Sequence, residues 1–275
     1  MGQYQNLEQI ATRRRIDVLN MIYAAKTGHI GGSMSSLDIL TALYYEVMDV
    51  EAIRQKADCR DRFILSKGHS VEGYYAILAD LGFFPKEQLA TYAQFDTTLT
   101  CHPTRKIPGI ELSTGALGHG LPVGVGMALC GKRDRKDYHV YVLMGDGEQA
   151  EGSVWEGAMA AGNYQLDNLT AIVDRNHLQI SGNTEDVMKL DPLGDRYRDF
   201  GFHVIECDGN DFDQIIPALR FRCPGKPVAI IANTIKGKGA SVMENKASWH
   251  HKVPSEEEFR SALSELEMKL GGVSK

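Results

Sequence analysis

The sequence has no long hydrophobic run, no export signal and no excess of basic charge. None of its apolar stretches approaches the ~20 residues that cross a bilayer. Its first residues, Met1 to Asn6, do not show a basic segment followed by an apolar one. With 30 Lys and Arg against 36 Asp and Glu, the formal net charge is −6. We therefore expect a cytoplasmic protein that binds neither nucleic acid nor membrane.

Cysteine patterns typical of disulfide scaffolds and metal sites are also missing. The five cysteines form no Cys-x-x-Cys pair and are odd in number, so we expect reduced thiols. Cys101 precedes His102, but adjacent residues rarely present their side chains to each other. A cysteine nucleophile paired with this histidine is therefore not expected.

Two common nucleotide-binding loops do not occur. There is no Gly-x-x-x-x-Gly-Lys-Ser/Thr sequence, and the pairs Gly118-x-Gly120 and Gly124-x-Gly126 follow no expected strand. Repeats, low-complexity tracts and Pro- or Ser-rich linkers are likewise missing. A single domain over residues 1–275 is therefore expected, without a P-loop or a dinucleotide fingerprint.

Strand and helix patterns alternate from residue 62 onward. Short apolar runs predict strands at residues 62–65, 139–143, 169–173, 203–207 and 228–232. Apolar periodicity and composition predict helices at residues 7–25, 71–81, 121–131, 153–161, 212–222 and 256–270. A glycine-rich break at 27–33 precedes another helix, which Ser35 or Ser36 would cap and which would run to Tyr45. This alternation predicts an α/β fold with a parallel sheet covered by helices on both faces.

Gly145-Asp146-Gly147 lies on the turn between a predicted strand and a predicted helix. Ligands of open α/β sheets bind at the carboxyl ends of the strands. Glycines let backbone amides approach a phosphate closely, and a carboxylate at such a place needs a partner. A divalent cation held between Asp146 and phosphate oxygens would supply one.

Asn176 ends the next predicted strand segment and offers a side-chain oxygen to the same cation, as does the carbonyl near Leu178. Between Gly147 and Asn176 lie 28 residues, 148–175. With the flanking Glu151-Gly152 and Asp174-x-Asn176, this spacing resembles the thiamine-diphosphate motif. The alternative, an ordinary strand-to-helix turn with a capping Asp, explains the Gly-Asp-Gly but not the spacing and the flanks.

Several histidines lie in loops. One loop histidine is most simply a surface or capping residue, whereas several around a diphosphate and a sugar could donate hydrogen bonds and move protons near neutral pH. The candidates are His29, His69, His102, His119 and His250.

These motifs together resemble the N-terminal, diphosphate-binding part of transketolases. They cover nearly the whole chain in family order, and the length resembles the separate N-terminal subunit of a split transketolase. The matching segments are Thr27-Gly28-His29, Ser66-Lys67-Gly68-His69, Thr114-Gly115-Ala116-Leu117-Gly118-His119-Gly120, the Gly-Asp-Gly to Asn176 unit and Thr234-Ile235-Lys236-Gly237-Lys238-Gly239.

The resemblance implies a thiamine-diphosphate fold and a set of site residues. The implied ligands of Mg²⁺ or Ca²⁺ are Asp146, Asn176 and the carbonyl of Leu178. The implied cofactor-binding residues are His69, Gly115, Leu117, Gly145, Asp146, Gly147, Glu151, Asn176, Ile180 and His250. The implied catalytic residues are His29, His69, His102 and His250, with His29 and His102 facing the donor sugar. The cofactor would add to a ketose carbonyl while the histidines handle protons.

The resemblance also implies a partner. In this family a pyrimidine-binding domain, with the glutamate that activates the cofactor, follows on the chain, and nothing in this sequence encodes it. A C-terminal subunit would supply it in an α₂β₂ assembly, with Glu151 and Glu156 near the interface.

Three positions depart from the family pattern. Full-length members often have an arginine before Gly-His-Pro that holds a substrate phosphate, whereas this chain reads Phe95-Asp96-Thr97-Thr98-Leu99-Thr100-Cys101-His102-Pro103. His119 replaces a usual Gln, and His251 replaces a Gly common in split subunits. The roles of His119 and His251 therefore stay open, as does the sugar: a pentose phosphate, a branched sugar phosphate or a sulfonated sugar.

Two other functions are compatible with the motifs. One is half of a decarboxylating thiamine-diphosphate synthase, and the other is a cofactor-binding regulator without catalysis. The Lys-Gly-Lys-Gly segment and the histidine set favour a transketolase that transfers a two-carbon ketol unit.

Overall fold

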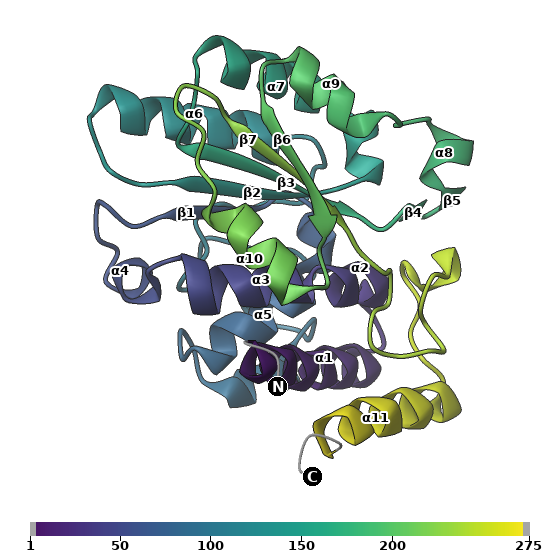
Figure 1. The fold of residues 1–275 in the computed structure, drawn as a ribbon. Coiled ribbons are helices and arrows are strands. Elements are labelled where there is room, and N and C mark those ends of the chain that lie inside the picture. The colour runs from purple at the N-terminus through teal and green to yellow at the C-terminus, as the bar shows by residue number, and fades with distance from the viewer. Residues whose placement is uncertain (1–3, 272–275) are drawn as a thin grey trace.

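The computed structural model describes residues 4–271, built around a five-stranded sheet (Figure 1). The strands lie in the order β1-β2-β3-β7-β6, and every neighbouring pair is parallel. Their bounds are Arg62–Leu65 (β1), Val140–Gly145 (β2), Leu169–Arg175 (β3), His203–Asp208 (β6) and Val228–Asn233 (β7). The carboxyl ends of all five strands therefore lie along one edge. The predicted parallel α/β fold and its five strands are confirmed.

Helices cover both faces of this sheet. One side carries α6 (Gly120–Arg133), α7 (Gly152–Asn163) and α9 (Leu193–Asp199). The other carries α1 (Gln5–Ala25), α3 (Leu37–Ala42), α5 (Val71–Asp80) and α10 (Phe212–Arg220). Figure 1 shows the two groups above and below the sheet. Helix α11 (Glu256–Gly271) lies alongside α1 as a further layer, with the rings of Tyr23 and Phe259 stacked at 4.1 Å.

Alternate residues of each strand build two separate hydrophobic clusters. In β2, Tyr141 and Leu143 pack on the α1 side, whereas Val140, Val142 and Met144 pack on the α6 side. Successive side chains of a strand point to opposite faces, so a strand covered on both faces has no polar side. This explains why the strands read as unbroken apolar runs in the sequence.

The glycine-rich segment predicted as a break contains a helix, α2 (Ile30–Ser35), which is fully buried. Its glycines permit close packing, because a Cβ on Gly31 would lie 2.6 Å from the carbonyl oxygen of Trp249. The prediction that Ser35 or Ser36 caps the following helix is wrong. Both hydroxyls donate to the carbonyl oxygen of Gly32, at 3.1 and 2.9 Å, because the chain before them is already helical.

Several shorter elements have no counterpart in the sequence analysis. They are a π-helical turn at Leu43–Val47, α4 (Val50–Arg54), α8 (Thr184–Val187), α9, and the hairpin of β4 (Leu178–Gln179) and β5 (Gly182–Asn183). Residues 96–117 form an irregular stretch, as predicted. Within residues 4–271, none of the helices has the length and apolar character needed to cross a bilayer.

Candidate functional site

A cavity of about 450 Å³ lies at the carboxyl ends of β1, β2 and β3. Its lining residues are His29, Gly32, Lys67, His69, Gly115, Leu117, Gly145, Asp146, Gly147, Glu148, Ala150, Glu151, Asn176, Leu178, Gln179, Ile180, Ser181, Lys236 and His250. All the predicted cofactor and metal residues are in this set, with three of the four predicted catalytic histidines. The fourth, His102, lies behind the wall, where a Cβ on Gly115 would come within 3.3 Å of its Cδ2.

The predicted metal ligands follow the two neighbouring strands β2 and β3. Asp146 is 2% exposed, and its carboxylate accepts from the amides of Gly147 at 2.7 Å and His177 at 2.5 Å. The side-chain oxygen of Asn176 accepts from the amide of Leu178 at 3.1 Å. The strand ends and these short loops thus bring the three predicted ligand residues to one wall of the cavity.

This donor set fits a hard divalent cation. Burial and the nearby Asp174 carboxylate raise the pKa of Asp146 to about 6, so its charged form lacks a full partner within the chain. Within residues 4–271 no group of three His, Cys, Asp or Glu side chains could hold a metal. One carboxylate with amide and carbonyl oxygens, completed by phosphate and water, is the arrangement that Mg²⁺ commonly takes.

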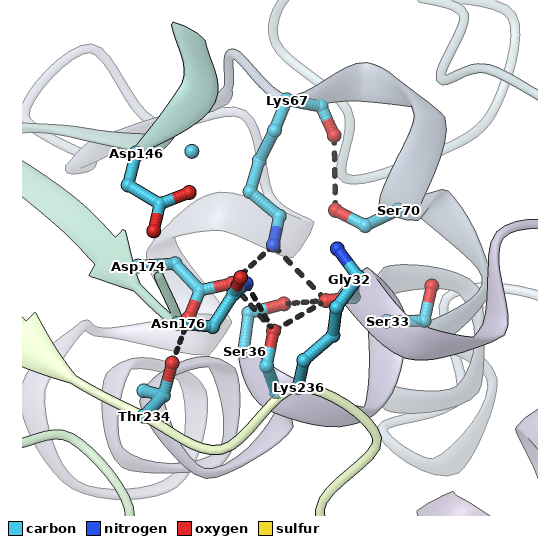
Figure 2. Close-up of polar contacts among 12 residues, drawn as sticks. Gly32, Ser33, Ser36, Lys67, Ser70, Asp146, Asp174, Asn176, Thr234 and Lys236 are labelled. Atoms are coloured by element: carbon cyan, nitrogen blue, oxygen red, sulfur yellow. Dashed lines mark hydrogen bonds and ion pairs between the residues drawn. The ribbon is translucent and has the colours of Figure 1, made fainter. Parts of the chain in front are cut away.

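Lys67, on the loop after β1, is a buried cation at the inner end of the cavity. It is 2% exposed, donates to the carbonyl oxygen of Gly32 at 3.0 Å, and pairs with the fully buried Asp174 (Figure 2). Asp174 also accepts from the hydroxyls of Ser35, at 2.6 Å, and of Thr234. A buried ion pair is tolerated when its remaining polar groups are bonded in this way. The pair joins α2 and the loops after β1 and β7 to the end of β3.

Lys236, on the loop after β7, supplies a second buried ammonium. Its Nζ donates to the carbonyl oxygen of Leu178 at 3.1 Å and lies 3.2 Å from Nδ1 of His250. Burial and the nearby Lys67 charge lower the pKa of Lys236 to about 8. Two ammonium groups in one dry cavity repel each other, so an anion such as a diphosphate would bind favourably between them.

The loop after β7 is held by a polar clamp. The guanidinium of Arg15 donates to both carboxylate oxygens of Asp38, at 2.9 and 2.8 Å, and to the carbonyl oxygen of Lys238 at 2.9 Å. Asn210 donates to Asp38 at 2.7 Å and accepts from the amide of Ile235 at 2.9 Å. Bidentate Arg–carboxylate pairs fix geometry as well as charge. The clamp therefore connects α1 and α3 to the loop that carries the second ammonium.

Glu148 ties together three of the loops around the cavity. It is 2% exposed and accepts from the hydroxyl of Ser66, from the amide of Gly118 at 2.8 Å and from the amide of Gly145 at 2.9 Å. Burial raises the pKa of this carboxyl group, and the three donors oppose that shift. Its contacts hold the predicted cofactor-binding glycines at the ends of β1 and β2.

Arg175 holds the loop that follows β3. Its guanidinium donates to Thr184 at 2.8 Å, Glu185 at 2.8 Å and Asp191 at 3.1 Å, and lies 3.6 Å from Asp146. The side chain is 1% exposed, so these contacts lie in a dry environment. Arg175 thus links the predicted metal ligand to the whole segment that covers this side of the cavity.

Five imidazoles gather at the other end of the cavity, with His29 at the centre. The ring of His29 lies 5.1 Å from His69, 5.6 Å from His250, 4.5 Å from His251 and 6.4 Å from His102. The predicted catalytic histidines thus lie together, and His251 joins them. His119 lies apart from this cluster and contacts the carbonyl oxygen of Leu117 at 3.0 Å.

The buried members of the cluster are neutral near pH 7. Burial, with the neighbouring imidazoles, lowers the pKa of His29 to about 4, and burial with the Lys236 charge lowers that of His250 to about 3. Burial also holds the pKa of His69 well below its usual range. A neutral imidazole has one nitrogen that donates and one that accepts, so these rings can bind hydroxyl groups in either sense.

His29 is positioned by a carboxylate from α5. Glu72 is fully buried and accepts from the backbone amide of His29 at 2.9 Å, the hydroxyl of Ser33 at 2.6 Å and that of Tyr92 at 2.6 Å. The ring nitrogen Nδ1 of His29 is buried and has no hydrogen-bond partner within residues 4–271. Buried polar atoms are nearly always bonded, so this nitrogen points to a ligand group.

Lys67 and Lys236 are the functional residues to which the sequence analysis assigned no role. Both stand in segments that carry the family resemblance, Ser66-Lys67-Gly68-His69 and Thr234-Ile235-Lys236-Gly237. A lysine beside glycine directly after a predicted strand was the available signal. It did not show that both ammonium groups would be buried in the same cavity as Asp146.

Comparison with known proteins identifies relatives of the whole chain. Residues 7–270 match the family described as "Transketolase, thiamine diphosphate binding domain". One of the named subunits of the apulose-4-phosphate transketolase of Phocaeicola vulgatus is 48% identical over 275 residues, which is 99% of this chain and 98% of that protein. The 6-deoxy-6-sulfo-D-fructose transketolase subunit SqwG of a Clostridium species is 44% identical over 243 residues, 87% of this chain and 88% of that protein.

Longer transketolases match with one part of their length. That of Rattus norvegicus is 38% identical over 90% of this chain, which spans 40% of the rat protein. Among solved structures, the transketolase of Campylobacter jejuni has a TM-score of 0.86 at 29% identity, over 97% of this chain and 43% of that one. The Leishmania mexicana transketolase has a TM-score of 0.85 at 28% identity, over 95% of this chain and 41% of that one.

Acid should destabilise the chain through its buried neutral histidines. Below pH ~6.5 the unfolded chain takes up protons on His29 and His250, whereas the folded chain does so only near their lowered values of about 4 and 3. Their contribution to stability is therefore complete above pH ~6.5 and is lost as the pH falls towards 4. We expect a loss of about 1 kcal/mol per histidine near pH 5, allowing for partial exposure.

Urea denaturation of the purified chain across this pH range measures the effect. The variants His29→Gln and His250→Gln should each show a shallower fall in the free energy of unfolding. A slope identical to that of the unmodified chain in both variants would contradict the assignment.

Proposed function

Because this chain belongs to the transketolase family, we propose that it binds the diphosphate of thiamine diphosphate and transfers a two-carbon ketol unit between sugars as one subunit of a split enzyme. The chain is a transketolase-type transferase subunit, since relatives of nearly its own length are named as transketolase subunits. They do not favour the alternatives of a decarboxylating synthase half or a silent regulator.

The observation that carries the proposal is one cavity with two chemically different ends. At the inner end, the Asp146 carboxylate lies with two buried ammonium groups, those of Lys67 and Lys236. At the outer end lie neutral imidazoles around His29. A metal-bound diphosphate suits the first environment, and the hydroxyl groups of a sugar suit the second.

Each part of this chain has a task in the proposed reaction. Asp146, Asn176 and the Leu178 carbonyl would hold Mg²⁺ or Ca²⁺. The glycine backbone near Gly147 would admit the diphosphate closely, since a Cβ there would lie 3.0 Å from that of Gln179. Thiamine diphosphate, when bound, supplies the carbanion-stabilising chemistry that ketol transfer needs.

The histidines would handle the protons of the sugar. A neutral His29, with an unpaired ring nitrogen, can accept a proton from a sugar hydroxyl or donate one to it. His69 and His250 flank it at 5.1 and 5.6 Å and would border the cofactor, whereas His102 would complete the sugar-facing side. The cavity wall around them limits access of water to the reacting atoms.

We further propose that a second subunit carries the pyrimidine-binding domain and that two copies of each chain form an α₂β₂ complex, with residues 1–275 as the diphosphate-binding domain. The match to only 40% of longer transketolases supports this division. Glu151 and Glu156, at the start of α7, are exposed and would lie near the partner. The expected cytoplasmic location stays a prediction.

The proposed donors are ketoses with an anionic group at their far end. One group of relatives is named for a 4-phosphate and another for a 6-sulfo sugar, so a distal phosphate or sulfonate is common to both. A branched ketose phosphate is the first candidate, because the two apulose-4-phosphate transketolase subunits are 48% and 46% identical to this chain.

Asp146→Ala should abolish metal-dependent cofactor binding, because Asp146 supplies the one carboxylate of the proposed metal site. Calorimetry with Mg²⁺ and thiamine diphosphate on the reconstituted complex measures the affinity, and circular dichroism checks the fold. Asp199→Ala, an exposed carboxylate on α9, is the matched control and should bind normally. Unchanged cofactor affinity in Asp146→Ala would remove Asp146 from the metal site.

His29→Ala and His102→Ala should impair the sugar step more than cofactor binding. We expect a lower kcat or a higher KM for the donor, with the Kd for thiamine diphosphate little changed, because both rings lie on the side away from Asp146. Steady-state kinetics and calorimetry on the same preparations separate the two effects. Weakened cofactor binding with unaltered sugar parameters would reverse the assignment.

The purified chain without its partner should be inactive. In this family the carboxylate that activates the cofactor belongs to the pyrimidine-binding domain, and a cofactor bound only at its diphosphate leaves its reactive end in water. The assay combines the chain with thiamine diphosphate, Mg²⁺ and panels of ketoses and aldehydes. Sustained ketol transfer by the chain alone would refute the split-enzyme proposal.

A further inference from the structure

A continuous row of contacts leads from the metal end of the cavity to its rim. The carbonyl oxygen of Leu178 accepts from Lys236 at 3.1 Å, and Lys236 lies 3.2 Å from His250. The ring of His250 lies 5.6 Å from that of His29, which lies 4.5 Å from that of His251. His251 is exposed, whereas His29 and His250 are partly buried. It is therefore the outermost member of the row.

The chain holds His251 in place through its neighbours. Trp249 is 2% exposed, and its amide donates to the carbonyl oxygen of Lys246 at 3.1 Å. The amide of His250 donates to the carbonyl oxygen of Ala247 at 2.9 Å. On the other side of His251, the ammonium of Lys252 lies 4.3 Å from the centre of the Trp249 ring. A side chain between two anchored residues loses little entropy when it binds a ligand.

The positive charges of the cavity lie at the opposite end from His251. Among the described residues that line it, Lys67 and Lys236 are the cations other than histidine, and both belong to the inner end. Lys252, next to His251, already pairs with Glu258. An anionic group at the far end of a bound ketose therefore meets no lysine that is available to it, and meets an imidazole N–H first.

We propose that the His251 imidazole donates a hydrogen bond to the tetrahedral anionic group, a phosphate or a sulfonate, at the far end of the donor ketose. This assignment rests on the proposed ketol transfer, and it makes His251 a specificity-determining residue. The inner residues hold the ketol portion in the same position for every donor, so His251 discriminates between donors by what they carry beyond it.

The test uses the complex of this chain with its partner subunit, one aldehyde acceptor at saturation and three donors. The donors are apulose 4-phosphate, 6-deoxy-6-sulfo-D-fructose and erythrulose, a four-carbon ketose without an anionic group. His251→Gly should raise the KM of one or both anionic donors about 5–10-fold, as for a lost hydrogen bond to a charged group at a partly exposed position. The KM of erythrulose and the Kd of thiamine diphosphate should not change.

Two further variants make the result specific. His251→Gln keeps a side-chain N–H donor and should recover part of the lost affinity. Lys252→Gln alters the neighbouring charge and should leave all three KM values unchanged. An effect on the phosphate donor alone, or on the sulfonate donor alone, supports the assignment and identifies the anion.

Other outcomes overturn the assignment. Unchanged KM values for both anionic donors in His251→Gly would show that His251 does not contact them. An equal rise for all three donors would show that the substitution disturbs the site as a whole. If the unmodified complex transfers no ketol unit from any donor, the proposed function fails and this inference fails with it. Transfer by the unmodified complex with no donor-dependent change in the variant refutes His251 alone.

Discussion

The buried ion pair between Lys67 and Asp174 is the interaction on which the rest of the site depends. The two charges come from segments 107 residues apart and meet where β1 and β3 end. Removing two ions from water is costly, so the pair persists because Ser35, Thr234 and the Gly32 carbonyl occupy its remaining positions. Loss of one partner would leave an unpaired buried charge, at a cost of about 3–5 kcal/mol. Function thus requires an arrangement that an apolar core would not need.

The pair also sets the chemistry of the neighbouring groups. Asp174 lies 3.5 Å from the amide nitrogen of Asn176, which turns the oxygen of that side chain towards the loop of Leu178. The charge of Lys67 contributes to the lowered pKa of Lys236. A network that already satisfies one ammonium leaves the second one in need of an anion. Binding of a diphosphate would therefore release electrostatic strain that folding has built into the cavity.

The strand ends of the site could be predicted from local sequence, and the charges between them could not. Gly145-Asp146-Gly147 follows an apolar run, and strand and turn are both local signals, so its position was predicted correctly. The partnership of Lys67 with Asp174 depends on strand order, which no short segment encodes. Helix α2 was missed for a related reason. Its glycines disfavour a helix locally, but tertiary packing against Trp249 requires small residues there.

The cavity has a polarity that orients what enters it. Its inner end carries ammonium groups and one carboxylate, whereas its outer end carries imidazoles that are neutral near pH 7. A molecule with a strongly anionic end is drawn inward, and a polyhydroxylated molecule loses less by staying outward, because neutral imidazoles replace its hydrogen bonds to water without a charge to screen. Lys236 joins the two ends by contacting both the Leu178 carbonyl and His250. An anion bound at the inner end would stabilise the ammonium form of Lys236, and His250 Nδ1 could then act as its acceptor. Occupation of the inner end would in this way fix the tautomer of a ring that borders the outer end.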